Sequence, residues 1–427
     1  MLRQLGTKSE FPLDESCLVH SLHGIISQRS AKLMNSRRDF LKQMSGAALS
    51  AGIAPSLLSW SLPISQRGAI AIPGEDGMII RSFRFVDLET PVEYLNTWLT
   101  PVPHFFVRNH MHEPSELNAS DLNAEAWRLA VGGEVEKPLT FTFAELAKLE
   151  SHSVVNTLEC AGNGRSLYRP QVPGIQWGKG AVGTARFSGP RLREVLHSAG
   201  VKSSAMHVMF RGLDEVPGKV PAFIRSIPIE KALDPDTLIA IHMNGAPLTK
   251  HHGFPARTLV PGWIGAASCK WLTEIKILES EFVGNFMSPA YRFPNQPIKP
   301  GDAVKPEDTH PLTELSVKSV ISGPLEGASL KGGRVAIQGA AWAGEAEIAN
   351  VEVSTDGGAS WNPATLGHDQ AHYAWRLWNY EWKAKSGDYT LLSRATDKRG
   401  RTQPAAPAWN PSGYLYNAVD QVKIHVA

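Results

Sequence analysis

Residues 157–165 read Thr-Leu-Glu-Cys-Ala-Gly-Asn-Gly-Arg, and this stretch decides how the chain is interpreted. The residues before it, 153–158, have a strand-like pattern and would deliver Cys160 into a loop. Glycines in that loop allow a bulky partner to approach the backbone closely. Arg165 would lower the thiol pKa and favour thiolate, the form that binds metals. The spacing alone favours a buried structural cysteine, because free cysteine is among the most buried residue types.

Two other stretches place histidines and cations on both sides of this loop. Residues 103–110 read Pro-His-Phe-Phe-Val-Arg-Asn-His. Residues 251–257 read His-His-Gly-Phe-Pro-Ala-Arg and lead through Val-Pro-Gly at 260–262 to Ser-Cys-Lys-Trp at 268–271. Each stretch alone is ordinary. Together they suit a phosphate-bearing anionic cofactor held by cations and backbone N–H groups.

In their order and spacing these stretches resemble the sulfite oxidase family of molybdopterin-dependent oxidoreductases, in particular exported bacterial sulfite dehydrogenases. The resemblance covers nearly everything after about residue 90. It implies a Mo-molybdopterin cofactor with one molybdenum, bound to the thiolate of Cys160. The implied reaction is oxygen-atom transfer to sulfite, or to a related small sulfur oxyanion, which gives sulfate. The electrons would pass to a separate acceptor such as cytochrome c.

The resemblance also assigns roles to individual residues. Cys160 would be catalytic, together with Arg108 and Arg165 as cations for the oxyanion substrate and Trp177 as a pocket tryptophan. The residues assigned to the cofactor are Phe106, Val107, Arg108, Asn109, His110, Asp214, His252, Arg257, Ser268, Cys269 and Lys270. Asp214 and Ser268 are equally compatible with simple turn residues.

Several positions depart from the family pattern and leave the substrate open. Residues 341–347 read Ala-Trp-Ala-Gly-Glu-Ala-Glu, with glutamates where the family has a substrate arginine. The active-site tyrosine expected after residues 270–271 has no clear match, and Tyr291 is the candidate substitute. Gly164 replaces a residue that is often basic. A sulfane-sulfur dehydrogenase or a sulfoxide reductase of the same fold is therefore the alternative function.

The bulk composition is that of a globular protein with two folded domains, because 427 residues exceed one ordinary core. The net charge of +2 provides no field that would attract nucleic acid. Three cysteines do not make a disulfide framework. The chain has no Cys-x-x-Cys-His sequence, so we expect no haem in it and a separate electron acceptor.

The N-terminal segment has the pattern of an export signal. Residues 36–42 read Ser-Arg-Arg-Asp-Phe-Leu-Lys, and no charged residue then occurs until Arg67. Ala69-Ile70-Ala71 resembles a cleavage site. We therefore expect residues 1–71 to be a twin-arginine signal and leader, and the mature protein to be periplasmic. Prolines at 55 and 63 argue against a stable membrane span.

The rest of the chain predicts an α+β fold in two parts. Residues 78–288 indicate a mixed α/β molybdopterin-binding domain, with helices at 144–149 and 190–199 and strands at 205–210 and 271–278. Six prolines between 289 and 311 predict a linker without regular structure. Residues 312–427 predict strands only, in an immunoglobulin-like β-sandwich. The resemblance makes this sandwich a dimerisation domain, so a homodimer is expected.

Two hypotheses from other functional classes remain. One is a secreted binding protein with an immunoglobulin-like domain and no chemistry. The other is a zinc hydrolase that uses His251 and His252. Adjacent histidines point apart on a strand and no matching third ligand is evident, which disfavours zinc.

Overall fold

The computed structural model describes residues 77–115 and 124–427. The predicted signal and leader, residues 1–71, therefore lie outside the described residues. Within the described ranges, no helix has the length and apolar character needed to cross a membrane.

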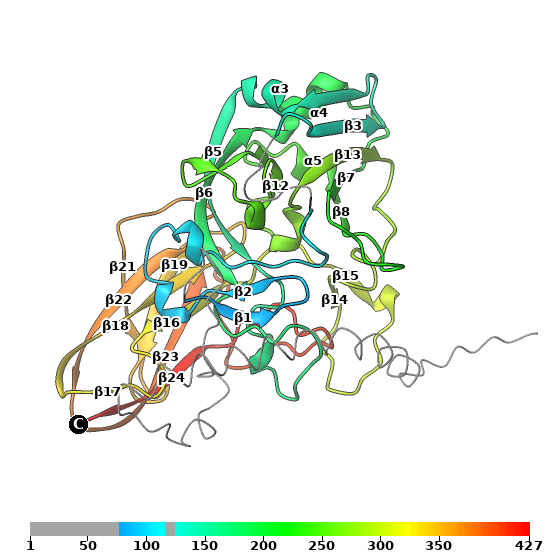
Figure 1. Cartoon of the computed structure of the whole chain (residues 1–427). Helices are drawn as coiled ribbons and strands as arrows, with labels where there is room; N and C mark the ends of the chain where they lie inside the picture. Colours follow the sequence, from blue (N-terminus) through cyan, green and yellow to red (C-terminus); the bar gives the residue numbers. More distant parts are fainter. Residues whose placement is uncertain (1–76, 116–123) are drawn as a thin grey trace, which may run out of the picture. The chain divides into compact units, whose positions relative to one another are not determined.

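The first part of the described chain is built on two larger sheets, with strand orders β4-β3-β13-β7-β8 and β11-β10-β6-β5 (Figure 1). The first sheet contains β3 (Arg128–Gly133), β4 (Leu139–Thr142), β7 (His207–Gly212), β8 (Ile224–Pro228) and β13 (Leu272–Leu278). The second contains β5 (Ser151–Glu159), β6 (Val182–Pro190), β10 (His242–Met243) and β11 (Ala246–Pro247). Two antiparallel pairs join β1 (Ile79–Ser82) to β2 (Asp87–Glu89) and β9 (Leu238–Ala240) to β12 (Arg257–Leu259). Strands β7 and β13 confirm the two strands predicted in this region.

Helices are few in this part, so it is predominantly β rather than evenly mixed. The α-helices of the described residues are α3 (Phe143–Lys148), α4 (Leu192–Ala199) and α5 (Ile229–Ala232). Helix α3 starts at a capping box, in which Thr142 Oγ1 accepts from the N–H of Glu145 and the Glu145 carboxylate accepts from the N–H of Thr142. Helix α4 ends at Gly200 in a left-handed conformation, as predicted. Single 3₁₀ turns connect other strands: η3 (Val92–Tyr94), η4 (Val102–His104), η5 (Arg165–Leu167), η6 (Lys250–His252) and η7 (Gly265–Ala267).

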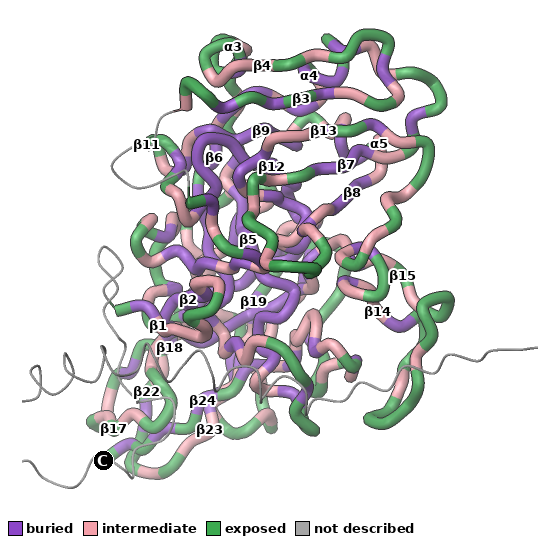
Figure 2. The backbone as a smooth tube through the Cα atoms, turned by 45° about the vertical axis from the view of Figure 1, so that its right-hand side comes forward, coloured by how far each residue is buried: buried purple, intermediate pink, exposed green. Residues whose placement is uncertain are grey.

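The pairing of β5 with β6 presents the cysteine. The two strands are antiparallel over nine residues each, from Ser151 opposite Pro190 to Glu159 opposite Val182. Both are largely buried, as the purple tube in Figure 2 shows. Beyond the last pair, the N–H of Cys160 still donates to the carbonyl of Ala181 at 2.9 Å. Cys160 therefore leaves a buried, well-anchored strand, which limits where its thiol can lie.

The proline-rich segment 289–311 does contain regular structure, so that prediction was wrong. Strands β14 (Arg292–Pro294) and β15 (Thr309–Pro311) pair antiparallel, and η8 (Pro306–Asp308) precedes the second strand. A two-stranded ribbon leaves one edge of each strand unpaired. Proline, which has no N–H to donate, is tolerated at such an edge.

The last part of the chain consists of two sheets, with strand orders β16-β18-β22-β21 and β17-β24-β23-β19-β20 (Figure 1). The first contains β16 (Lys318–Gly323), β18 (Gly333–Trp342), β21 (Thr365–Leu366) and β22 (Arg376–Ala384). The second contains β17 (Ser329–Leu330), β19 (Ile348–Ser354), β20 (Asn362–Pro363), β23 (Gly387–Asp397) and β24 (Asp420–Val426). Ile337 and Trp378 of one sheet share a hydrophobic core with Val351, Leu391 and Ile424 of the other. The prediction of strands only is confirmed, whereas their immunoglobulin type stays a prediction.

A hydrophobic core also continues from the first part into the last. Leu192 and Ile275 belong to the same buried cluster as Val320, Trp342 and Trp375. The last part therefore packs against the first through apolar side chains, in addition to the polar contacts described below.

Candidate functional site

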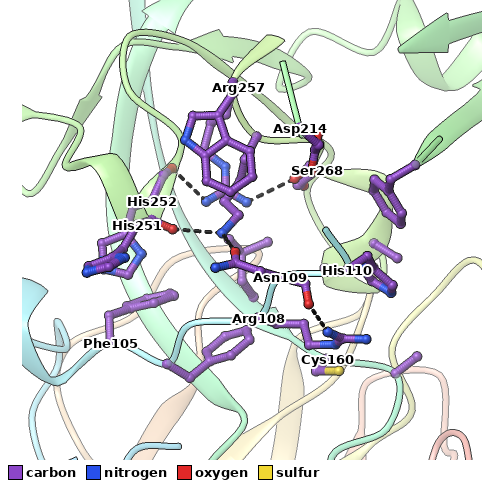
Figure 3. Close-up of a pocket in the computed structure, with 18 of the residues that line it drawn as sticks. Phe105, Arg108, Asn109, His110, Cys160, Asp214, His251, His252, Arg257 and Ser268 are labelled. Carbon is purple, nitrogen blue, oxygen red and sulfur yellow. Dashed lines mark hydrogen bonds between the residues drawn. The ribbon is translucent and has the colours of Figure 1, made fainter. Parts of the chain in front are cut away.

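One pocket collects most of the residues that the sequence singled out (Figure 3). It encloses about 690 Å³ of space not filled by atoms, part of which opens to solvent. The segment after η4, the end of β5, the segment after β7 and the chain from η6 to β13 contribute to its wall. Ten predicted site residues line it: Phe106, Arg108, Asn109, His110, Cys160, Asp214, His252, Arg257, Ser268 and Lys270.

Cys160 lies in this wall with 8% of its surface exposed. Burial raises the pKa of its thiol, while the charges of Arg108 and Arg165 and a hydrogen bond from the backbone of Gly162 act in the opposite direction. The thiol is thus buried and reachable only from the pocket. A cationic surrounding of this kind favours the thiolate once a metal ion replaces the proton.

Arg108 is held in place by a buried carboxylate. Asp87 Oδ1 accepts from the Arg108 guanidinium and from the N–H of Asn109, both at 3.1 Å. Burial is the largest single influence and disfavours the charged guanidinium, but Asp87, Tyr291 and Cys160 together outweigh it and raise the pKa of Arg108. Arg108 therefore stays cationic in the same pocket as the Cys160 thiol (Figure 3).

Arg257 and Lys270 form a second cationic group in the pocket. The Arg257 guanidinium donates to the carbonyls of His252 at 3.0 Å and Ser268 at 2.9 Å, and its buried Nε has no hydrogen-bond partner. Lys270 Nζ donates to Asn109 Oδ1 and to the carbonyl of His251. Burial lowers the pKa of Arg257 to about 10 and the pKa of Lys270 to about 8. A buried cation, Arg257, and a half-buried one, Lys270, are together stabilised by an anion, so this end of the pocket suits a phosphate.

The residue pattern did not single out Glu113, which holds two pocket residues together. Its Oε1 accepts from Asn109 Nδ2 at 2.8 Å and lies 2.7 Å from His251 Nδ1. Burial would raise the pKa of Glu113, but the hydrogen bonds to His251 and Asn109 and the charge of Lys270 bring it down to about 2. A negative charge between these groups keeps the wall assembled.

We expect Glu113→Gln to lower the free energy of unfolding by roughly 3 kcal/mol at neutral pH, the equivalent of its pKa shift. Because the folded pKa is depressed, this contribution is present above pH 4.5, the ordinary value, and fades as pH falls toward 2. Denaturant unfolding at pH 7 and at pH 3.5 measures it. The difference in the free energy of unfolding between variant and wild type should be smaller at pH 3.5 than at pH 7. An equal difference at both pH values would contradict this role of Glu113.

Tyr291, the candidate for the missing tyrosine, does line the pocket. Its hydroxyl hydrogen-bonds His110 Nε2 at 2.5 Å, and the His110 ring stacks on Phe223 at 4.3 Å between centroids. Arg225, a cation that the sequence analysis did not select, lies 4.9 Å from the Tyr291 ring centroid. Burial raises the pKa of Tyr291, so its hydroxyl remains a hydrogen-bond donor at neutral pH.

Four predicted side chains are not among those that line this pocket, and their assigned roles stay predictions. The Arg165 guanidinium donates to the carbonyls of Ser412 and Ile175 and so turns toward the C-terminal segment. Trp177 is fully buried in the cluster behind the pocket wall. The backbone of Val107 pairs with Leu88, which directs its side chain to another cluster.

Cys269 is the fourth of these side chains. It belongs to the main hydrophobic core, while its backbone N–H donates to Thr258 Oγ1 at 2.7 Å. Burial raises the pKa of its thiol to about 12, so it stays a neutral core residue. Both Cys160 and Cys269 are free thiols.

The glutamates that replace the expected substrate arginine also point elsewhere. Glu345 pairs with Lys231 at 2.9 Å and accepts from Trp263 Nε1 at 2.8 Å, and neither glutamate lines the pocket. Glu347 pairs with Lys398 at 2.6 Å. Their charges are therefore neutralised locally and do not oppose an anion in the pocket.

The unusual Gly164 also has a structural reason. Its φ is +86°, and a Cβ at this position would lie 2.8 Å from Tyr416 Cβ. A larger, basic residue would be strained here and would collide with the C-terminal segment.

Comparisons with known proteins agree with this geometry. Residues 115–286 match the family profile described as "Oxidoreductase molybdopterin binding domain". Residues 309–427 match "Mo-co oxidoreductase dimerisation domain". Sulfite oxidase of Gallus gallus is 36% identical over 364 residues, 81% of this chain and 77% of that protein.

Mitochondrial sulfite oxidase of Rattus norvegicus is also 36% identical over 364 residues, and the chain spans 65% of its length. Among solved structures, the sulfane dehydrogenase SoxCD from Paracoccus pantotrophus has a TM-score of 0.71 and 26% sequence identity. That similarity covers 89% of this chain and 98% of the SoxCD chain.

Proposed function

The chain belongs to the sulfite oxidase family of molybdopterin-dependent oxidoreductases, and from this premise we propose that it oxidises sulfite, or a closely related sulfur oxyanion, by oxygen-atom transfer. The molybdenum group, when bound, supplies the oxygen-atom transfer and accepts two electrons. A separate acceptor, such as a cytochrome c, would then receive the electrons. Because the chain spans only 65% of the rat enzyme, its activity is our proposal.

The residues present fit this cofactor. Cys160 is the one soft ligand in the pocket wall, and a thiolate suits such a metal. Arg257, with its unpartnered Nε, and Lys270 would hold the phosphate end of the pterin together with Ser268. Asn109, His110, Asp214 and His252 would line the pterin. Burial lowers the pKa of His252 to about 3, so its ring is neutral and can accept as well as donate.

The observation that carries the proposal is the placement of the Cys160 thiol and the Arg108 guanidinium in one pocket. Arg108 would attract and orient the anionic substrate beside the metal, since its charge is secured by Asp87. The Tyr291 hydroxyl would donate a hydrogen bond to a substrate oxygen or, through its hydrogen bond with His110, keep that ring oriented. The buried wall would exclude water from the reacting atoms.

Metal analysis and a steady-state assay test this function together. We expect about one molybdenum per chain and sulfite-dependent reduction of cytochrome c. Protein matured through export that contains no molybdenum would favour the non-catalytic binding protein instead. Molybdenum without sulfite turnover, but with oxidation of a sulfane sulfur or reduction of a sulfoxide, would favour the second candidate. The similarity to SoxCD and the missing substrate arginine support that candidate.

Arg108→Gln should raise the Michaelis constant for sulfite by roughly 10- to 100-fold, because a charge-assisted contact to the substrate is lost. Molybdenum content should change much less. Arg108→Lys keeps the charge but loses the planar guanidinium, so its Michaelis constant for sulfite should lie between those of the wild type and Arg108→Gln. Initial rates against sulfite concentration measure the constant, and an unchanged value would refute this role for Arg108.

The remaining expectations are also proposals. We propose a twin-arginine leader over residues 1–71 with export to the periplasm and a molybdopterin domain at 78–288. We also propose that 289–311, which contains the β14–β15 ribbon, connects this domain to an immunoglobulin-like dimerisation domain at 312–427. The immunoglobulin assignment is supported by the strand orders. The order β16-β18-β22-β21 corresponds to A-B-E-D of immunoglobulin domains, and β24-β23-β19 corresponds to G-F-C. Light scattering across a dilution series tests the homodimer, and N-terminal sequencing of secreted protein tests the leader.

A further inference from the structure

A buried polar cluster joins the residue before Cys160 to the C-terminal sheets. The Glu159 carboxylate accepts from Lys318 Nζ at 2.5 Å, from Trp342 Nε1 at 2.9 Å and from Asn163 Nδ2 at 2.9 Å. Lys318 begins β16 and Trp342 ends β18, and the two residues face each other as a cross-strand pair. One end of the four-stranded sheet thus presents two donors to one carboxylate.

This cluster is shielded from water. Glu159 is 3% exposed, Lys318 6%, Asn163 1% and Trp342 fully buried. A charged pair in such surroundings holds a defined geometry, because separating its members leaves each charge without solvent or partner. Glu159 is joined to Cys160 by a peptide bond, so fixing the Glu159 side chain restricts the backbone that leads into the cysteine.

The C-terminal part of the chain also forms hydrogen bonds with the cysteine loop and with the strand before it. The N–H of Leu415 donates to the carbonyl of Ala161 at 2.8 Å, and the N–H of Trp375 donates to Thr157 Oγ1 at 2.8 Å. Asn163 Oδ1 accepts from the N–H of Ala181 at 3.0 Å, which ties the loop back to β6. Contacts from the C-terminal part therefore lie on both sides of position 160.

We propose that the C-terminal sheets set the position of Cys160, with Lys318 as the positioning residue that acts through Glu159. The cysteine loop would then depend on a domain whose matched profile is named only for dimerisation. The inference rests on the proposed role of Cys160 as the metal ligand. It adds that the metal environment is tuned from outside the molybdopterin domain.

The test uses Lys318→Met in the full-length, cofactor-loaded protein, with two measurements. Amide hydrogen exchange of the peptide that spans residues 160–165 should accelerate by at least about tenfold, which corresponds to roughly 1.4 kcal/mol easier opening. The electron paramagnetic resonance spectrum of the Mo(V) state should change, because the thiolate is displaced. Lys318→Arg retains a donor cation, so its exchange rate and its Mo(V) spectrum should both be closer to those of the wild type. Trp342→Phe removes one neutral donor and should act in the same direction more weakly, which covers a failure of Lys318→Met to fold.

A matched control exists elsewhere between the same two parts of the chain. Lys231 pairs with Glu345 at 2.9 Å, and Glu345 also accepts from a tryptophan, Trp263. Lys231→Met removes a pair of the same residue types, with a more exposed glutamate, that does not touch the cysteine loop. It should therefore alter neither the exchange of residues 160–165 nor the spectrum. Wild-type values in Lys318→Met and Trp342→Phe, or equal changes in Lys231→Met, would overturn the proposal. If wild-type protein lacked molybdenum, the proposed function would be refuted. The hydrogen-exchange measurement would still test whether Lys318 positions the cysteine loop.

Discussion

Replacement of Cys160 by alanine should reduce turnover at least about a thousandfold, the equivalent of roughly 4 kcal/mol of transition-state stabilisation. The physical reason is the loss of the soft thiolate in a pocket that offers no other sulfur ligand in its wall. Initial rates with sulfite and cytochrome c, normalised to protein, measure the effect.

Folding should survive this change. Removing one sulfur atom from a pocket wall should cost about 1 kcal/mol, as most single substitutions do. Circular dichroism and thermal unfolding would verify the fold. Cys160→Ser keeps the size and polarity but not the soft ligand, so it should be as inactive as the alanine variant. Full activity of either variant with molybdenum bound would refute the assignment of Cys160.

Arg257→Met should lower molybdenum content in the purified protein by about 10- to 100-fold, because it removes a buried cation that, in the proposed function, would hold the cofactor phosphate. The same change breaks two hydrogen bonds to the carbonyls of His252 and Ser268. These carbonyls belong to the two segments that close this end of the pocket, so the wall would loosen as well.

Metal analysis of Arg257→Met and Arg257→Lys separates the two effects. Lysine keeps the charge but cannot reach both carbonyls, so partial retention of molybdenum is expected. Wild-type metal content in the methionine variant would show that Arg257 is structural only. A loss of metal with an unchanged melting temperature of the cofactor-free form would point to cofactor binding alone.

Local patterns predicted the elements that depend on neighbouring residues. Helix α4, strand β7 and strand β13 follow from the spacing of apolar residues. The strands in 289–311 were not predicted, because a high density of prolines does not exclude strands whose unpaired edge carries the prolines. The low helix content also escaped prediction, since short apolar runs fit strands and helices alike.

The site shows the same division. The resemblance carried by the three motifs together was enough to select Arg108, Cys160 and Arg257, which the fold gathers in one pocket. It gave no sign that the Arg165 guanidinium donates to the backbone carbonyls of Ser412 and Ile175. Glu113 was missed because a lone glutamate carries no motif until His251 and Asn109 lie beside it.

By itself the sequence determined the chemistry available: a cysteine in a loop with two glycines, a set of cations and the family that their pattern resembles. Only the tertiary structure decided which of these groups face one another. It also decided that the C-terminal sheets hold Glu159, next to the cysteine, through Lys318 and Trp342. The reason is that burial and hydrogen-bond pairing depend on contacts between residues more than a hundred positions apart, which local patterns do not encode.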